Sequence, residues 1–494
     1  MASFIGIDLG TTYSVISYID KTGRPKIIHN NDNGDNTTPS CIKFKGDSVL
    51  YVGEEAKIQI GLSDNVASRF KRDMDSQQKH VYDGHTHTPT TLSSEILKKL
   101  YQDALTKNVA TSSGDSSDVV ITVPANFANV ARVATKKAAK LAGIKEVKLI
   151  DEPTAAALYY AFESGGSLNG YYAVYDLGGG TFDISIVKIQ GFDVEVIETD
   201  GIARLGGDDF DKTLQKIVQK KYLEDTGEEL EEEDFTKTDA EKQKKSLSTR
   251  DVNVRINRKN YPVTQDEFQD EIRPRIKKTI RVCKSVLKKS GLEIKDIEEV
   301  FLVGGSTRIP SVEDAVKKAF KMGPKSTINV DEVVALGASV YSAHRANQSK
   351  LNPAQKSSIE KINVQDVTPA YFGFICNKFD KKRKKDVETV SIIIPKNTKR
   401  PCGVTKQYVT LDDNQINVPC SVTSSMNDSK DPSFVTKVWD GSLGPLPGGR
   451  PRGQPIDVTF KFDVDGIMFA SFVDLSSGKK KDIKLSDIEE NVDT

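Results

Sequence analysis

Short apolar runs alternate with helical periods along the first 345 residues of the chain. Two stretches have helical spacing: 130–141 spaces alanine, lysine and arginine for one exposed face, and 154–162 is rich in alanine. The runs with the character of strands are 4–7, 119–123, 147–150, 171–175 and 184–189. We expect the last two to pair as a hairpin. Strands interleaved with helices predict an α/β region that extends to about residue 345.

The pattern changes after this region. Residues 346–365 are polar with few apolar positions, and we expect them to form a linker. From 366 to 485, short β-branched runs are separated by turn residues, which predicts an all-β sandwich. The runs are 391–394, 406–411, 417–422, 458–462 and 468–473. No long helical period follows, so 486–494 are expected to form a short tail.

Composition narrows the class of protein. The 494 residues carry 70 basic and 70 acidic side chains, which argues against dedicated DNA or RNA binding but leaves a local basic patch open. Five cysteines lie far apart without a Cys-x-x-Cys pair, which excludes a disulfide scaffold and disfavours a zinc module. The start of the chain has no apolar signal core, and no apolar run approaches the ~18 residues of a membrane span. We therefore expect a soluble, cytoplasmic protein without membrane association.

The strongest local feature occurs twice. Asp8-Leu9-Gly10-Thr11-Thr12 follows the first strand, and Asp176-Leu177-Gly178-Gly179-Gly180-Thr181 follows a strand in mid-domain. Glycine lets backbone N–H groups approach phosphate oxygens, threonine hydroxyls add neutral donors, and the aspartates can hold Mg²⁺ through its waters. Two opposed turns of this kind would clamp a triphosphate between two lobes. One such turn would be weak evidence, since tight hairpins also contain it, and neither P-loop nor Rossmann spacing is present.

Two further segments lie at strand ends. Gly304-Gly305-Ser306-Thr307-Arg308 follows the strand 300–303 and could approach a nucleoside, with Arg308 stacking on the base. Glu152, in Asp151-Glu152-Pro153-Thr154, could orient an attacking water, although Pro153-Thr154 alone would indicate only the start of a helix.

These motifs together resemble those of the 70-kDa heat-shock chaperones, the Hsp70 or DnaK-like family. In that family's order, the chain contains Gly6-Ile-Asp-Leu-Gly-Thr-Thr, Glu152-Pro-Thr-Ala-Ala-Ala, Asp176-Leu-Gly-Gly-Gly-Thr-Phe-Asp, Leu205-Gly-Gly-Asp-Asp-Phe-Asp and Val303-Gly-Gly-Ser-Thr-Arg-Ile-Pro. The resemblance covers almost the whole chain. It implies an α/β, actin-like, two-lobed ATPase domain with a duplicated ribonuclease-H-like core over 1–345, then a β-sandwich at 366–485 that grips extended peptides.

The resemblance also implies roles for the cleft residues. Asp8 and Asp176 are expected to hold Mg²⁺ through water, with Thr181 beside them, and Glu152 to position the lytic water. Lys71 matches the lysine that approaches the transferred phosphoryl group, where a fixed cation offsets developing charge, although its position alone would favour an exposed surface lysine. The expected cofactors are ATP or ADP, Mg²⁺ and K⁺. The residues expected to bind the nucleotide are Gly10, Thr11, Thr12, Tyr13, Gly178, Gly179, Gly180, Gly206, Gly207, Glu241, Lys244, Lys245, Ser248, Gly304, Gly305, Ser306, Arg308 and Asp331.

Several positions depart from the family pattern. Lys245 stands where relatives usually have an arginine that stacks on adenine, so nucleotide should be held less tightly, by ~1 kcal/mol. In the linker, Asn363 and Gln365 replace two of four apolar residues, and burying each amide unpaired would cost about 1–3 kcal/mol. Docking of the linker is therefore expected to be weaker. Asp151 stands where relatives have asparagine, near the approach of J-domain partners.

The resemblance extends to coupling and peptide binding. The residues expected to relay the nucleotide state between domains are Pro124, Arg132, Lys148 and Asp366. The residues expected at the peptide cleft are Phe372, Phe374, Tyr408 and Val418, of which the two phenylalanines replace smaller aliphatic residues. Lys378–Lys385 forms a longer and more basic loop than in relatives. It suits a solvated hairpin tip, a docking surface for an acidic partner or ribosomal RNA, or a nuclear-import signal.

The sequence therefore predicts an ATP-dependent chaperone of the Hsp70 type. Its ATPase would be slow and stimulated by J-domain partners, nucleotide-exchange factors would release ADP, and its substrate would be unfolded or extended polypeptide. No helical lid and no acidic terminal tetrapeptide follow the β-domain in this sequence, which fits either a naturally short member of the family or a chain cut before its lid. From such a lidless cleft, peptide release is expected to be fast. The alternative is a scaffold of the ribosome-associated kind, which would bind ATP without a peptide-binding cycle. Sugar kinases share the actin-like core but lack the β-domain.

Overall fold

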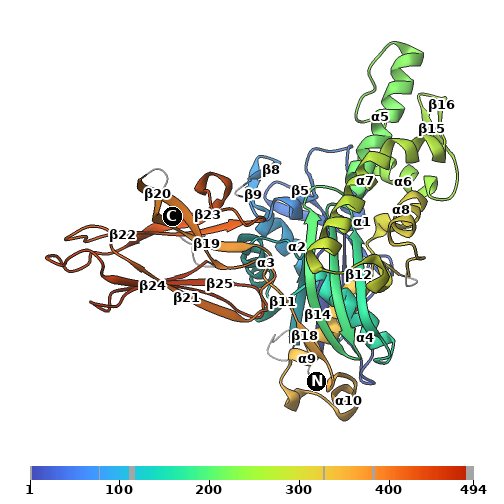
Figure 1. Ribbon diagram of the computed structural model, residues 1–494. Helices are drawn as coiled ribbons and strands as arrows, with labels where there is room; N and C mark the ends of the chain where they lie inside the picture. Colours follow the sequence, from blue (N-terminus) through green and yellow to red (C-terminus); the bar gives the residue numbers. More distant parts are fainter. Residues whose placement is uncertain (1–2, 77, 111–116, 326–328, 381–383, 486–494) are drawn as a thin grey trace. The chain divides into compact units, whose positions relative to one another are not determined.

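The computed structural model describes residues 3–76, 78–110, 117–325, 329–380 and 384–485. Figure 1 shows the chain with its elements labelled. The described chain divides into two compact units. Unit 1 contains Met1–Asn126 and Ala134–Val364, and unit 2 contains Phe127–Val133 and Gln365–Thr494.

The first sheet of unit 1 has the order β11-β10-β1-β2-β3, with β4 pairing β2. Its strands are β1 (Ser3–Asp8), β2 (Tyr13–Ile19), β3 (Pro25–Ile27), β4 (Thr38–Pro39), β10 (Ser117–Val123) and β11 (Val147–Asp151). β1, β2 and β3 form an antiparallel meander, whereas β10 and β11 add in parallel on the side of β1. The central strand β1 is apolar on both faces, as expected for a strand that is covered on both sides.

The second sheet of unit 1 repeats this arrangement, with the order β17-β12-β13-β14-β18. Its strands are β12 (Asn169–Leu177), β13 (Phe182–Gln190), β14 (Asp193–Ile202), β17 (Ile297–Val303) and β18 (Asn363–Gln365). Here β12, β13 and β14 form the antiparallel meander, and β17 adds in parallel beside β12. The hairpin expected from 171–175 and 184–189 is the β12–β13 pair. In both sheets the first strand of the meander carries an aspartate at its end, Asp8 as the last residue of β1 and Asp176 as the second-last residue of β12.

The helices of the described chain are α1 (Glu54–Lys57), α2 (Pro89–Thr106), α3 (Asn129–Leu141), α4 (Glu152–Glu163), α5 (Gly207–Thr226), α6 (Lys237–Leu247), α7 (Gln265–Ser290), α8 (Pro310–Phe320), α9 (Val333–Arg345) and α10 (Pro353–Ile359). All lie in unit 1 except α3, which begins in unit 2, and α2, α4, α7 and α9 contact strands of the two sheets. α9 lies against β1 and β2 so closely that a Cβ on Gly6 would meet the Ala335 carbonyl at 2.5 Å. α4 approaches α9 at Gly337, where a side chain would collide with Ala155.

Smaller elements build the rest of unit 1. The strands are β5 (Cys41–Lys45), β6 (Ser48–Val52), β7 (Val66–Ser68), β8 (His80–Tyr82), β9 (His85–His87), β15 (Val252–Ile256) and β16 (Lys259–Val263). The 3-10 turns are η1 (Phe70–Asp73), η2 (Ile294–Asp296), η3 (Gly305–Arg308) and η4 (Gln348–Lys350). In Figure 1 the green and yellow elements α5, α6, β15 and β16 gather at one end of unit 1. The stretch expected to be a linker, 346–365, contains η4, α10 and β18.

Unit 2 consists mainly of two four-stranded antiparallel sheets, with the orders β20-β19-β22-β23 and β21-β24-β25-β26. The strands are β19 (Tyr371–Asp380), β20 (Lys385–Ile394), β21 (Cys402–Val409), β22 (Val418–Ser425), β23 (Thr436–Leu443), β24 (Pro455–Phe462), β25 (Met468–Asp474) and β26 (Lys480–Lys484), with the turn η5 (Pro432–Phe434). Alternate side chains of β24 and β25 are buried, which is the pattern of sheets that share one core. The α/β region and the all-β region expected from the sequence are both present.

The helices and the cysteines of the described chain bear on the expectations from composition. None of the helices in the described part of the chain is long and apolar enough to span a membrane. All five cysteines lie within the described residues, and each is a free thiol. Burial raises the pKa of Cys41 and Cys420 to about 12, so these thiols stay protonated at neutral pH.

Candidate active site

A cavity of about 960 Å³ opens in unit 1, lined by segments from both sheets. Asp8 and Asp176 enter it from the ends of β1 and β12, Glu152 from the first turn of α4, and Lys71 from η1. The side chains cited as catalytic from the sequence therefore come together, although they are far apart along the chain. All of the expected nucleotide-contacting residues except Gly206 line the same cavity.

Negative charge is concentrated at the inner end of this cavity. The Lys71 ammonium lies 2.7 Å from a Glu152 oxygen, and both side chains are buried. Withdrawal from water and the nearby Glu152 raise the pKa of Asp8 to about 7, although Lys71 and a hydrogen bond from Thr122 oppose this rise. The same causes raise the pKa of Asp176 well above its usual value. One cation does not neutralise these carboxylates, so the arrangement favours the entry of another.

The two glycine turns face each other across the cavity. A Cβ on Gly179 would meet the Thr12 hydroxyl at 1.9 Å, and a Cβ on Gly180 would meet that of Thr11 at 2.6 Å. The Thr12 hydroxyl is buried without a hydrogen-bond partner within the described residues. Only glycine permits this approach, and a buried unpaired hydroxyl is costly unless a ligand completes it. The turns therefore present donors toward a shared space suited to phosphate oxygens, and the buried carboxylates beside them suit a hydrated Mg²⁺.

The start of α5 supports the second turn. The Gly207 N–H donates to the Gly178 carbonyl at 3.0 Å, and the Asp208 N–H donates to the Gly179 carbonyl at 2.9 Å. Gly206 lies so close to the turn that a Cβ there would meet the Gly179 backbone at 2.6 Å. Gly206 thus positions the turn without lining the cavity.

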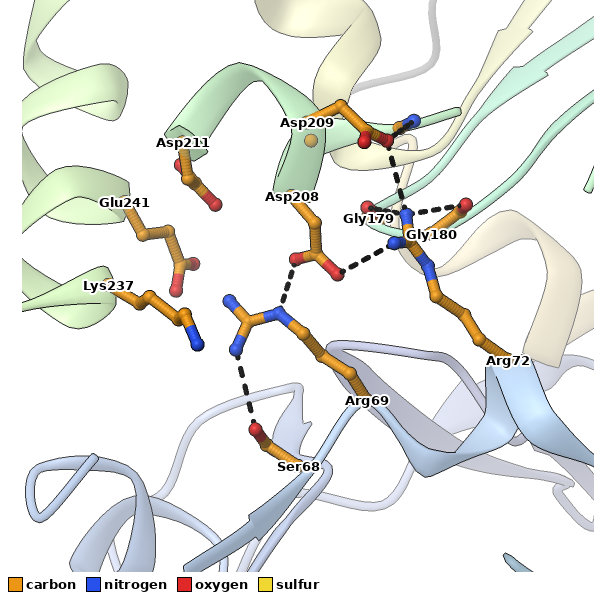
Figure 2. Close-up of polar contacts among 12 residues, drawn as sticks. Ser68, Arg69, Arg72, Gly179, Gly180, Asp208, Asp209, Asp211, Lys237 and Glu241 are labelled. Carbon is orange, nitrogen blue, oxygen red and sulfur yellow. Dashed lines mark hydrogen bonds and ion pairs between the residues drawn. The ribbon is translucent and has the colours of Figure 1, made fainter. Parts of the chain in front are cut away.

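Two arginines that sequence reasoning did not select join the two sides of the cavity (Figure 2). Arg69 precedes η1 and places its guanidinium nitrogen 2.8 Å from the buried Asp208 carboxylate. Arg72 donates to the Gly180 carbonyl at 2.7 Å and lies 3.3 Å from Asp209. We call this set of ion pairs the arginine clasp. It holds the Gly178-Gly179-Gly180 turn and α5 against η1, the segment that carries Lys71.

Part of the arginine clasp could have been predicted from the sequence, because three of its residues directly follow recognised motif residues. Arg72 directly follows Lys71, and Asp208 and Asp209 directly follow Gly206-Gly207. Arg69 gave no comparable signal. Its φ of 62° places a non-glycine residue in the left-handed region, which local sequence does not predict.

A second ionic group borders the part of the cavity expected to hold the adenosine. Glu241 of α6 pairs with Lys57 at 3.0 Å and with Lys245 at 2.7 Å. Both ammonium groups also lie over the Tyr13 ring, at 4.4 and 4.8 Å from its centroid. Burial by itself raises the pKa of Glu241, but Lys57 and Lys245 outweigh it and bring that pKa to about 2. Lys57 was missed from the sequence. Lys245 donates to the Tyr13 hydroxyl and pairs with Glu241, so its ammonium is not free to reach toward the base.

The remaining expected contacts have defined places. Lys244 pairs with Asp211 at 2.7 Å and donates to the Gly207 carbonyl at 3.1 Å. Gly304, at φ 82°, begins the third turn, and Ser306 donates to the Gly178 carbonyl at 2.9 Å. Arg308 pairs with Asp331 at 3.1 Å and is half-exposed. Ser248 follows the end of α6 and lines the cavity.

The linker does not incur the expected cost of buried amides. Asn363 is exposed, and its N–H donates to the Phe192 carbonyl at 3.3 Å as β18 extends the second sheet. The Gln365 amide donates to the Arg400 carbonyl at 2.6 Å. Neither amide is buried unpaired, so the desolvation cost expected for them does not arise in this structure, and weaker docking of the linker stays a prediction.

The expected relay residues are partly buried and bonded. Pro124 directly follows β10 and is buried, and Arg132 is only 1% exposed. Lys148 on β11 pairs with Asp118 at 3.2 Å, and Asp366 pairs with Arg400 at 2.8 Å. A role in signalling between domains stays a prediction for all four.

The expected peptide-cleft residues lie in unit 2. Phe372 and Phe374 turn into its core with 3% and 4% of their surface exposed, against Phe462 and Tyr408 respectively. Tyr408 and Val418 are partly buried at the border of the same core. Direct contact of the two phenylalanines with a peptide stays a prediction. In the basic loop, Lys378, Lys384 and Lys385 are exposed, whereas 381–383 lie outside the described residues.

Comparison with known proteins shows which family and which relatives the chain resembles. Residues 4–82 and 63–494 match the model of the family described as Hsp70 protein. The chain is 34% identical over 495 residues to the chaperone protein DnaK of Thermotoga neapolitana, which covers 97% of this chain and 79% of that relative. The DnaK proteins of Thermotoga petrophila and Thermotoga maritima give the same identity and coverage.

Proposed function

The chain belongs to the Hsp70 family and is an ATP-dependent molecular chaperone of the Hsp70 type, and we propose how its residues carry out this activity. Proteins of this family are ATPases that bind ATP or ADP with Mg²⁺. The observation that carries the proposal is the meeting of the Thr11-Thr12 and Gly179-Gly180 turns above the Lys71–Glu152 pair. Unit 1 would have the two-lobed, actin-like architecture of the family, and the repeat of the meander in its two sheets supports this assignment.

The phosphates of ATP would lie between the two turns. Backbone N–H groups of the glycines and the hydroxyls of Thr11, Thr12 and Thr181 would donate to phosphate oxygens. Glu152 would accept a hydrogen bond from the attacking water and orient it toward the γ-phosphorus. Lys71 would lie beside the oxygens on which charge accumulates during transfer, where a buried cation is more effective than one in water.

Asp8 and Asp176 would hold the waters of Mg²⁺, which when bound would neutralise phosphate charge. The raised pKa of Asp8, about 7, follows partly from crowding with Glu152, and this crowding supports a cation site. K⁺ at the same cleft is part of the proposal. Lys57, Lys245 and Glu241 would close the outer end around the adenosine, opposite Gly305, Ser306 and Arg308.

Unit 2 would bind unfolded or extended polypeptide near Tyr408 and Val418. Several apolar side chains beside these residues are exposed, namely Val409, Leu411 and Ile416. Exposed apolar side chains in one segment suit contact with apolar residues of a peptide. The proposed hydrolysis is slow and stimulated by J-domain partners, exchange factors would release ADP, and the proposed location is the cytoplasm.

The experiment that tests this cycle uses Trp439 of β23, the one tryptophan in the chain. Its ring stacks on Phe472 at 5.7 Å inside unit 2, remote in sequence from the nucleotide motifs. Fluorescence would be recorded on adding ATP and then ADP with Mg²⁺ and K⁺, with binding measured separately by calorimetry. A shift specific to ATP is expected. An unchanged spectrum at saturation, with a silent probe on the linker, would contradict the cycle.

A scaffold function is the second candidate, and the exposed lysines Lys378, Lys384 and Lys385 favour it. Such a protein would bind ATP and dock on an acidic partner or ribosomal RNA through this loop. Binding that falls steeply with salt and is lost on charge reversal at these lysines, with no ATP-dependent Trp439 shift, would support the scaffold.

A further inference from the structure

Helix α7 carries a dense row of positive charge that the ATPase cycle does not use. From Ile272 to Ser290 it contains eight lysines and arginines and no acidic residue. The basic residues are Arg273, Arg275, Lys277, Lys278, Arg281, Lys284, Lys288 and Lys289. All are exposed except Arg275, which is partly buried. The chain as a whole has zero net charge, so this is a strong local departure from its composition.

The row lies on one face of α7 because the opposite face packs in the core of unit 1. Ile272, Ile276, Cys283 and Val286 of α7 are buried in a hydrophobic core cluster of unit 1, against β13, β14 and α8. Four basic residues then repeat along the outer surface with one residue in each turn, at Lys277, Arg281, Lys284 and Lys288. The row is ~16 Å long at 1.5 Å per residue. Among the labels of Figure 1, α7 lies with α5, α6 and α8 of unit 1.

Ion pairs do not account for the central part of the row. Arg273 pairs with Asp270 of the same helix, and Lys289 pairs with Asp200 of β14 at 2.8 Å. Across the part of the chain that the structure describes, no ion pair involves Lys277, Lys278, Arg281, Lys284 or Lys288. Like charges three or four residues apart destabilise a helix, and the favourable effect of cations on the helix dipole is confined to the last turn. Helix stability therefore gives no reason for the central lysines and arginine.

From this face we propose that α7 binds double-stranded RNA through its phosphates, independently of base sequence. No large apolar side chain is exposed on α7, so the face lacks the aromatic or aliphatic anchor that protein partners usually require. It also presents no aromatic ring on which an unpaired base could stack. A face made of cations alone matches a regular row of phosphates.

The packing of α7 favours duplex RNA over duplex DNA. A helix that reads DNA enters the major groove with much of its circumference free, whereas half of α7 is buried against the sheet and α8. Its exposed side chains can only lie across phosphates at the duplex surface. In A-form RNA the major groove is narrow and deep, so phosphates of both strands border one short span that a single row of cations can bridge.

The test uses the full chain and a fluorescently labelled 20-base-pair RNA duplex, with affinity measured at several salt concentrations. The variant K277E/K284E/K288E reverses three charges of the row. The matched control K212E/K216E/K220E reverses three exposed lysines spaced at one per turn on α5. We expect the α7 variant to bind at least tenfold more weakly, with a slope of log K against log salt reduced by about two to three units. The control should stay within twofold of the unchanged chain.

Three further arms complete the design. K277Q/K284Q/K288Q should show an intermediate loss, and ATP binding should be unchanged in all variants, which shows that they are folded. A DNA duplex of the same sequence should bind at least fivefold more weakly than the RNA. Equal loss in the α5 control, or equal binding of RNA and DNA, would overturn the proposal. Absence of RNA binding while polyglutamate binds in an α7-dependent way would replace it with an acidic protein partner.

Discussion

Unit 1 uses positive charge in two contrasting ways. In the cleft, Lys57, Lys71, Arg69 and Arg72 are largely buried, and each is held by a carboxylate on another segment. On α7, the central lysines and arginine are exposed and stand beside charges of their own sign. A buried pair fixes geometry and is costly to break, whereas an exposed cation costs little to remove and is free to meet a partner. The comparison predicts large effects of substitution in the cleft and small ones on the helix.

Removal of Arg69 should give the largest change in stability. Its loss leaves Asp208, which is 3% exposed, without its closest cation, and breaking such a pair typically costs about 3 kcal/mol. We expect Arg69→Ala to lower the free energy of unfolding by roughly 2–3 kcal/mol in urea titrations and to speed ADP release several-fold. The matched change is Arg204→Ala, which removes an exposed arginine 3.2 Å from Asp73 and should cost less than about 1 kcal/mol. Similar losses in both variants would contradict the contrast between buried and exposed pairs.

Lys71→Ala should have the largest effect on chemistry. Lys71 is 7% exposed and its ammonium is bonded to Glu152, and no other cation in the described part of the cleft is paired with that carboxylate. We expect ATP to bind while single-turnover hydrolysis slows at least tenfold, because the charge that develops on the phosphoryl group loses its fixed partner. The exposed Lys79→Ala serves as the control. Near-normal turnover in Lys71→Ala would remove this residue from the mechanism.

These effects show which parts of the cleft the sequence could predict. Asp8, Thr11, Thr12, Asp176 and Gly180 belong to contiguous motifs whose chemistry is local, so their meeting in one cavity was predictable. Ion pairs between distant segments leave no periodic signal along the chain, and the partners Arg69 and Lys57 were therefore missed.

The β-region shows a second limit of sequence reasoning. Short β-branched runs between turn residues predicted its strands, but Phe372 and Phe374 could face either a cleft or the core until the sheets were packed. On α7 the basic residues were visible in the sequence. Their exposure became known only when Ile276 and Cys283 were placed in the core, because a helix face is defined by what its opposite side contacts.

Substitution of Glu241 is expected to have a smaller effect on stability, and this effect should depend on pH. Its folded-state pKa of about 2 lies below the ordinary value of 4.5, so its contribution to stability is present above pH ~5 and is lost as pH falls toward 2. We expect Glu241→Gln to be less stable than the unchanged chain by about 1–3 kcal/mol at pH 7, with a difference that shrinks as pH falls below 4. Urea titrations between pH 3 and 7 measure this, and Glu229→Gln in an exposed acidic run is the control. If the difference in the free energy of unfolding did not depend on pH, packing of the Glu241 side chain, rather than its charge beside Lys57 and Lys245, would account for it.

The smallest change in stability is expected on α7, and there the sign of the change is more informative than its size. Lys284→Glu replaces a repulsive neighbour of Lys288 by an attractive one in the favourable order, with the acidic residue four positions before the lysine. It also relieves repulsion with Arg281, so the free energy of unfolding should rise by about 0.2–0.5 kcal/mol. Thermal unfolding at low salt should detect this gain, and 0.5 M salt should abolish it, because the charges are exposed. A gain in stability together with weaker RNA binding would mean that the row is retained at the expense of the helix. A loss of stability would mean that Lys284 makes a structural contact, and the basic face would then need no ligand to explain it.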